Sequence, residues 1–308
     1  MIKYLVSLLL IISVIACNNE QNQQSDDGFG SGDDFTVPDS ILNQEEAPLE
    51  VSEDAMDDII ENVSSPVEMA SLLKDEGVKF NYKLLSPTDN ADNYNSNFKQ
   101  ALNLGILGAD LGYLNMYNKT TSVIDYITAI KSLSDNLMIG QFFDFATLKR
   151  LATNSENIDS LMYISVSSFD KMDSYLRENN RSNISTLLVT GVWVEGLYLA
   201  TQVAKDTKID KINERIGEQK MALNDILIIV DNYKSDKNFY KLSESLTKLK
   251  DAFKNVKITY EAGESEMKEV NGVLTIVQND KSIVTITDED LAKIIETTKE
   301  VRNEIIRL

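Results

Sequence analysis

The sequence contains no histidine, and its only cysteine is Cys17. Histidine is the residue most often used to transfer protons near neutral pH, and it is the commonest metal ligand. A Ser-His-Asp or Cys-His catalytic site is therefore excluded. A single cysteine also excludes an intrachain disulfide and any cysteine-rich zinc or iron–sulfur site. The composition accordingly predicts no metal and no other cofactor.

Proline is also scarce, with four residues in the chain and none after Pro87. Long helices can therefore run through the remainder of the sequence without a residue that breaks them. The 308 residues are 43% hydrophobic, which is enough for a substantial buried core. The chain as a whole is predicted to fold rather than to be disordered.

Basic residues are few, with 30 Lys and Arg against 49 Asp and Glu. The imbalance is concentrated between Asn18 and Glu61, which contain 14 acidic residues and no Lys or Arg. We expect residues 17–61 to form a lipid anchor followed by an acidic, disordered tether, because such sequence buries too little apolar area to fold. No basic patch is evident, so nucleic acid is not predicted as a partner.

Residues 1–16 have the pattern of a secretory signal peptide, in which Lys3 precedes an apolar stretch from Tyr4 to Ala16. That stretch is too short to span a bilayer comfortably. The sequence Val14-Ile15-Ala16-Cys17 resembles the lipobox of bacterial lipoproteins. This resemblance implies that the chain is cut before Cys17 and that Cys17 carries two or three acyl chains. The alternative is a buried structural cysteine.

The acidic elements after Cys17, such as Ser25-Asp26-Asp27, look like export signals of surface-exposed lipoproteins in the Bacteroidota. The alternative is a solvated linker with no address function. If the resemblance holds, the protein is lipid-anchored in the cell envelope, at the outer membrane, and exposed on the cell surface. The lipid bilayer is then a partner through Cys17.

The body, residues 62–308, is predicted to be mainly α, as a multi-helix bundle of long antiparallel helices. Ser65-Pro66-Val67-Glu68 has the pattern of a capping box, and Gly77 is typical of a helix end. Apolar residues then recur at spacings of three, four and seven. They predict helices at about 92–118, 121–137, 142–153, 155–179, 182–206, 208–233 and 238–254.

One small β-hairpin is predicted near the C-terminus, at about 273–286. Val273–Val277 and Ile283–Ile286 are β-branched runs, and the residues between them have the composition of a turn. We expect this hairpin to lie on the helical body, because an isolated two-stranded ribbon is marginally stable. Residues 261–269 are predicted to form a loop. Thr287 is expected to cap a last helix that ends near Ile306.

Two apolar segments carry an acidic residue three positions before a tyrosine: Gly108–Leu114 with Asp110, and Val194–Leu199 with Glu195. Positions three and four apart share a helix face. The candidate site residues are therefore Asp110, Tyr113, Tyr117, Trp193, Glu195 and Tyr198. The similarity of the two segments is short. It leaves open whether the body consists of two related halves.

The same two segments are rich in glycine, at positions 105, 108, 112, 191 and 196. Glycine inside a helix costs about 1 kcal/mol relative to alanine, so we expect it to permit a close crossing of the two helices. Both acids would then be buried and would need partners. The candidate partners are Tyr113, Tyr198, Trp193 and an arginine such as Arg150 or Arg181.

These residues admit three interpretations. In the first, the acids are a structural polar core. In the second, they and the aromatic side chains form a pocket for a small cationic or sugar-like ligand. In the third, the carboxylates catalyse glycoside hydrolysis, which requires an open cleft. The absence of histidine and of a catalytic cysteine favours a binding or scaffolding protein over an enzyme.

The segments Phe98–Tyr113, Ile139–Asp144 and Gly191–Tyr198 look like a family of uncharacterised helical lipoproteins of the Bacteroidota, over roughly residues 80–230. The resemblance implies the compartment and a helical fold, and it supplies no catalytic residues. The overall prediction is an outer-membrane lipoprotein that acts as a binding or scaffolding module. Its further partner is an envelope protein or a small ligand that the sequence does not identify.

Overall fold

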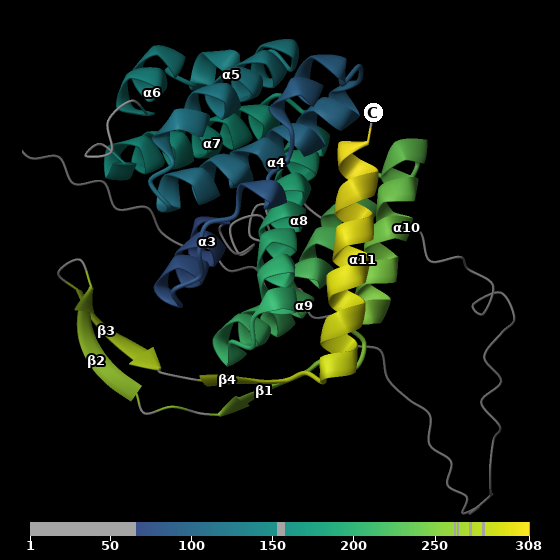
Figure 1. The fold of residues 1–308 in the computed structure, drawn as a ribbon. Helices are drawn as coiled ribbons and strands as arrows, with labels where there is room; N and C mark the ends of the chain where they lie inside the picture. Colours follow the sequence, from purple (N-terminus) through teal and green to yellow (C-terminus); the bar gives the residue numbers. More distant parts are fainter. Residues whose placement is uncertain are drawn as a thin grey trace, which may run out of the picture. The chain divides into compact units, whose positions relative to one another are not determined.

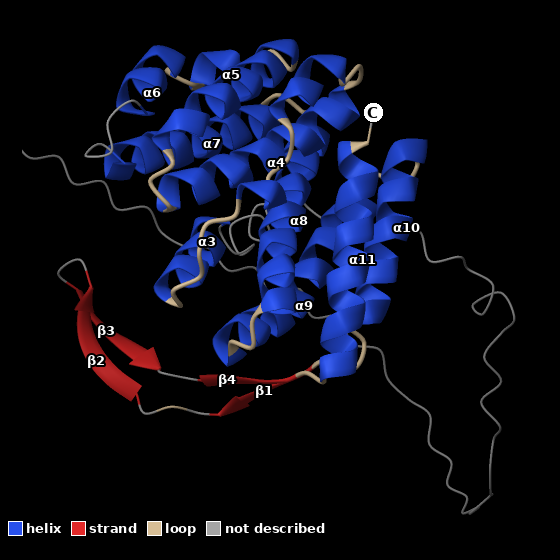
Figure 2. Cartoon of the chain, viewed as in Figure 1, coloured by secondary structure: helices blue, strands red, loops and turns tan. Residues whose placement is uncertain are grey.

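A computed structural model of the chain describes residues 66–152, 158–261, 263, 265–270, 273–278 and 281–307. The predicted signal peptide, Cys17, the acidic tether and the Ser65 cap lie outside these residues. The described part is a mainly α bundle with a small antiparallel β element near its C-terminus, which confirms the predicted fold class (Figures 1 and 2). The helices are α3 (Pro66–Asp75), α4 (Asn97–Met116), α5 (Thr120–Asn136), α6 (Phe145–Ala152), α7 (Ile158–Glu178), α8 (Ser182–Asp206), α9 (Asp210–Asp231), α10 (Lys237–Ala252) and α11 (Asp288–Ile306).

Local capping sets several helix ends. The Ser96 hydroxyl accepts a hydrogen bond from the backbone N–H of Lys99 at 3.3 Å, so α4 begins at Asn97 rather than near residue 92. Thr88–Asn93 instead form a short 3₁₀ helix, η2, and two more 3₁₀ helices lie at Tyr82–Leu84 (η1) and Gly140–Phe142 (η3). Gly77 follows α3 with a φ of 75°, in the left-handed region that glycine adopts without strain.

Helices α4 and α8 pack directly on each other at the centre of the bundle (Figure 1). A Cβ atom added to Gly105 would lie 2.1 Å from the carbonyl oxygen of Leu188, and one added to Gly191 would lie 2.1 Å from that of Leu102. The two backbones therefore touch where the glycines lie. This confirms that Gly105 and Gly191 permit the close crossing. Gly108 contacts the ring of Phe169 instead.

The other helices pack around this pair in the order of the chain. Helices α5, α6 and α7 contact one another in sequence, and α5 and α7 contact α4. Helices α9, α10 and α11 form a second group, in which α9 and α11 contact α8. Helix α8 is long and apolar enough to cross a membrane, but 89% of its most apolar 18-residue window is buried. Packing in the bundle core accounts for that composition.

The β element differs from the predicted hairpin in its pairing. Strand β1 (Lys257–Glu261) pairs with β4 (Lys281–Thr285), and β2 (Ser265–Val270) pairs with β3 (Val273–Gln278), both antiparallel. The two predicted runs are thus strands, but they do not pair with each other, and the predicted loop at 261–269 contains β2. In the sequence, β2 and β3 are separated by Asn271-Gly272, a dipeptide typical of two-residue turns. Of the two predicted runs, the second, β4, lies on the helical body as expected, and both β4 and its partner β1 contact α9.

Candidate functional site

The two predicted acids meet inside the bundle. Asp110 on α4 and Glu195 on α8 are both 0% exposed, and the Glu195 carboxylate lies close enough to raise the pKa of Asp110. The α4–α8 crossing brings them together, because each acid follows its crossing glycine by about one turn of helix. Two buried carboxylates without a counter-ion would be strongly destabilising.

Arg302 on α11 supplies the counter-ion. Its Nε donates to Oε2 of Glu195 at 2.9 Å, and its Nη2 donates to Oε1 at 3.0 Å. Such a bidentate pair is among the stronger side-chain interactions. The guanidinium carbon also lies 4.5 Å from the centre of the Tyr198 ring. The prediction of Arg150 or Arg181 as the partner is wrong, since Arg302 takes this role and Arg181 donates to the Leu137 carbonyl instead.

Asp110 makes a different set of contacts. Its Oδ2 accepts from the backbone N–H of Ser86 at 2.8 Å, whereas its Oδ1 is buried with no donor in reach. Burial, followed by the adjoining Glu195 carboxylate, raises the pKa of Asp110 well above its ordinary value of 3.8. Asp110 therefore keeps its proton to a higher pH than an ordinary aspartic acid does. With Asp110 protonated, the net charge of Asp110, Glu195 and Arg302 together is zero.

This proton makes the stability of the protein depend on pH. Because the pKa of Asp110 is higher in the folded than in the unfolded state, its contribution to stability is fully present below pH 3.8 and is lost as the pH rises through the folded pKa. We expect the stability of the wild type relative to Asp110→Asn to fall with rising pH over that range. Urea titrations of both proteins at several pH values measure the difference, and parallel curves would contradict the assignment.

Asp110→Asn also tests the geometry at neutral pH. The asparagine amide can donate to Glu195 and accept from Ser86, so we expect its free energy of unfolding to stay within about 1 kcal/mol of the wild type. Asp110→Leu leaves the Ser86 N–H without an acceptor and should cost about 1–3 kcal/mol more. Equal losses for the two variants in the same urea titrations would count against the hydrogen bonds described here.

The same cluster fixes the segment that precedes α4, residues 81–86. The backbone N–H of Asn81 donates to the Tyr113 hydroxyl at 3.2 Å. The Leu84 carbonyl accepts from Arg302 at 3.3 Å. The Ser86 N–H donates to Asp110, and the Ser86 carbonyl accepts from the Tyr126 hydroxyl at 2.6 Å. Buried side chains from α4, α5 and α11 therefore hold this segment in place.

The remaining predicted site residues lie in two places. Tyr113 and Tyr117 pack with Phe80, with ring centres 5.2 and 5.7 Å from the Phe80 ring. Trp193 does not join the acids, because its indole N–H donates to Gln219 on α9 at 2.9 Å. Asp110, Glu195 and Tyr198 thus form one cluster around Arg302. Tyr113 and Tyr117 border the 81–86 segment, and Trp193 belongs to the α8–α9 contact.

The sequence analysis missed Arg302, although a signal for it was present. On α11 the apolar face is formed by Leu291, Ile294, Ile295, Val301 and Ile305, and Arg302 falls on that same face. An arginine within the apolar stripe of an amphipathic helix is expected to have a buried partner. Ser86 and Tyr126, by contrast, carry no such signal. Ser86 takes part through its backbone N–H and carbonyl, and the Tyr126 hydroxyl bonds to a segment 40 residues earlier in the chain.

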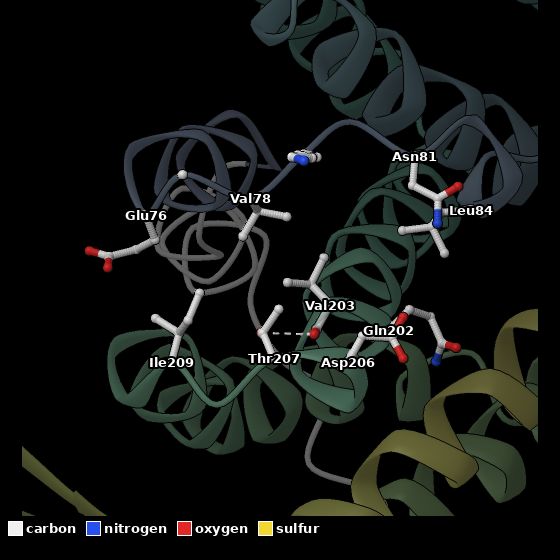
Figure 3. A pocket seen from close by; sticks show the side chains of 11 residues that line it. Glu76, Val78, Asn81, Leu84, Gln202, Val203, Asp206, Thr207 and Ile209 are labelled. Atoms are coloured by element: carbon white, nitrogen blue, oxygen red, sulfur yellow. Dashed lines mark hydrogen bonds between the residues drawn. The ribbon is translucent and has the colours of Figure 1, made fainter.

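Two surface cavities in the described part of the chain have walls to which neither acid contributes. The larger cavity has a volume of about 360 Å³ and lies between the end of α3 and the end of α8 (Figure 3). A smaller one, of about 250 Å³, lies where α4, α10 and α11 meet. Within the residues that the structure describes, no group of three or more Asp, Glu or Cys side chains could hold a metal ion.

The larger cavity nevertheless depends on the buried cluster. Asn81 and Leu84 form part of its wall, and these are the two residues fixed by Tyr113 and Arg302. Tyr113, which is a predicted site residue, and Arg302 therefore support the wall of a cavity that they do not line.

Comparison with known proteins adds no assignment. No family model, no curated protein and no solved structure matches the chain.

Proposed function

We propose that the protein is a lipid-anchored binding or scaffolding module of the cell envelope, held at the outer membrane through acylated Cys17. The support for the anchor is the Val14–Cys17 sequence and the acidic segment that follows it. Two acyl chains would suffice for stable membrane attachment, at about 0.8 kcal/mol per buried methylene. The resemblance to helical lipoproteins of the Bacteroidota agrees with this proposal.

The observation that argues against a catalytic role is the state of the two acids. Glu195 is 0% exposed and held in a bidentate ion pair, and Asp110 is 0% exposed beside it. Carboxylates that hydrolyse a glycosidic bond must flank the substrate and admit water. Fully buried acids that are engaged with Arg302 fit a structural role instead. We therefore propose no catalytic function for them.

The same burial argues against the second interpretation, in which Asp110 and Glu195 bind a small ligand themselves. A ligand would have to displace Arg302 or separate α4 from α8, whose backbones touch at the glycines. The surface cavity between α3 and α8 needs neither change. If the body binds a small molecule, we expect it to bind there.

Replacing Cys17 with alanine tests the anchor. In a bacterial host that processes lipoproteins, the wild type is expected to sediment with membranes and to enter the detergent phase on phase separation. Cys17→Ala should shift to the soluble fraction, because it cannot be acylated. Asn18→Ala, which leaves the cysteine in place, is the matched control and should stay with the membranes. Sedimentation of Cys17→Ala after a carbonate wash would reject lipid anchoring.

A further inference from the structure

The 81–86 segment lies against the buried acids but contributes little to the apolar core itself. Residues 81–83 are exposed, and Leu85 is the apolar side chain of the segment that is buried. Its internal hydrogen bonds are local, such as that from the Leu84 N–H to the Asn81 carbonyl at 3.3 Å. Segments with few buried apolar contacts open at a lower free-energy cost than the core of a protein. We therefore expect this segment to open while the surrounding helices stay folded.

The buried cluster is what keeps the segment closed. Asp110, Tyr113, Tyr126 and Arg302 each form one hydrogen bond with its backbone. These four side chains come from three helices, α4, α5 and α11, that are packed in the bundle. The segment is thus fastened at several points along its length, and its opening requires these bonds to break together.

Asp110 is the fastening whose charge depends on pH. Its Oδ2 accepts from the Ser86 N–H at 2.8 Å, whereas its Oδ1 is buried without a donor. Burial, followed by the Glu195 carboxylate, raises the pKa of Asp110. The other ionisable groups that face it are Glu195 and Tyr198 from α8, Arg302 from α11, Tyr126 from α5 and Tyr113 from α4. Burial raises the pKa of the three tyrosines above 10.0, and arginine stays protonated, so these groups keep their charge near neutral pH.

Opening the segment gives Asp110 access to water and returns its pKa toward the ordinary value of 3.8. The closed form then binds the proton more tightly than the open form, so low pH favours the closed form. Between the two pKa values, each opening releases one proton to solvent. The ratio of open to closed molecules therefore rises about tenfold per pH unit, and it levels off above the pKa of the closed form.

From this arrangement we propose that the 81–86 segment is a pH-gated strap, which stays closed while Asp110 holds its proton and opens as that proton passes to solvent. Asn81 and Leu84 lie in the wall of the cavity between α3 and α8 (Figure 3), so opening removes part of that wall. The gate couples pH to the shape of the cavity. It depends neither on the lipid anchor nor on the identity of a ligand.

Hydrogen exchange of the full-length lipidated protein in detergent tests the proposal, with overlapping peptides that isolate the Ser86 amide. Hydroxide catalysis alone raises amide exchange about tenfold per pH unit, and proton-linked opening adds a second factor of about ten. We expect the logarithm of the Ser86 rate to rise with a slope of about two from about pH 5 up to the pKa of the closed form. The rate should exceed that of amides in the centre of α8 at least about 100-fold, because opening is local. A slope of about one throughout pH 5–9, or a rate equal to that of α8, would overturn the proposal.

Variants separate the gate from its other fastenings. Asp110→Asn cannot titrate, so its Ser86 amide should show a slope of about one. Tyr126→Phe removes the hydrogen bond to the Ser86 carbonyl and should raise the rate about fivefold at every pH, with the slope of about two retained. Asp89→Asn, at an exposed position three residues after Ser86, is the matched control and should behave like the wild type.

Two outcomes of this series would reject the gate. A slope of about two that persists in Asp110→Asn would assign the pH dependence to another group. An unchanged rate in Tyr126→Phe would show that the buried cluster does not hold the segment closed. Membrane attachment through Cys17 is measured separately, so failure here leaves the anchoring result intact.

Discussion

Replacing Arg302 with methionine is expected to lower the free energy of unfolding by about 3–5 kcal/mol, the cost of leaving a buried charge without its partner. Glu195 is 0% exposed and receives two hydrogen bonds from this guanidinium. Methionine fills part of the space but donates no hydrogen bond. The Leu84 carbonyl loses its donor in the same variant. Urea denaturation followed by circular dichroism measures this change as a shift of the unfolding midpoint, with an unchanged slope of the unfolding free energy against urea concentration.

Arg307→Met is the matched control for this prediction. Arg307 follows the same helix and is exposed, so its replacement should change the free energy of unfolding by less than about 0.5 kcal/mol. The unfolding free energy of Arg302→Lys should fall between those of Arg302→Met and Arg307→Met, because lysine keeps the charge but cannot form the two parallel hydrogen bonds. An Arg302→Met protein as stable as the control would show that the ion pair does not hold the bundle together.

Gly191→Ala is expected to destabilise the protein by at least about 3 kcal/mol, or to prevent folding. Alanine normally stabilises a helix relative to glycine by about 1 kcal/mol, so the expected change has the opposite sign. The added Cβ would lie 2.1 Å from the carbonyl oxygen of Leu102. A backbone atom cannot move aside by rotating a side chain, so α4 and α8 would have to separate. Gly105→Ala should behave in the same way, because its Cβ meets the Leu188 carbonyl.

Gly108→Ala gives the comparison, since it lies on the same helix as Gly105. Its Cβ would meet the ring of Phe169 at 2.7 Å, and a side chain can adjust. We expect a loss of about 1–2 kcal/mol, within the usual range for overpacking. Thermal and urea unfolding of the three glycine variants measure the order of their stabilities. If Gly191→Ala proved as stable as the wild type, the close crossing of α4 and α8 would be wrong.

The helices were predictable because each depends on a local pattern of apolar residues and caps. Helix α8 has the bounds expected from the sequence, Ser182–Asp206. Errors arose at ends that depend on one hydrogen bond, such as the Ser96 cap of α4. The glycines also indicated a close helix crossing, since their cost within a helix requires compensation. Local sequence was sufficient in each of these cases.

Pairing between distant segments was harder to predict. The strands β3 and β4 were recognised from their β-branched residues, but a composition alone does not select a partner. Asn271-Gly272 carried the stronger turn signal. The sequence analysis overlooked this dipeptide and took the polar residues 278–282, which also resemble a turn, as the hairpin turn.

The candidate site shows the same division between local and distant information. Helical spacing placed Asp110 and Glu195 on apolar faces, and the expectation that both are buried is confirmed. Their partner lies 107 residues beyond Glu195, and its place on α11 becomes meaningful only when α11 packs on α8. The cavity between α3 and α8 could not be predicted, because it is formed by helix ends and by a segment that distant side chains hold in position.

A double-mutant cycle between Glu195 and Arg302 is the most direct test of the claim that the buried acids are structural. Urea unfolding of the wild type, Glu195→Gln, Arg302→Met and the double variant yields the coupling energy. We predict a coupling of at least about 2 kcal/mol, with the double variant less destabilised than the sum of the single ones, because removing both partners leaves no unpaired buried charge. Additive losses, within about 0.5 kcal/mol, would contradict this account.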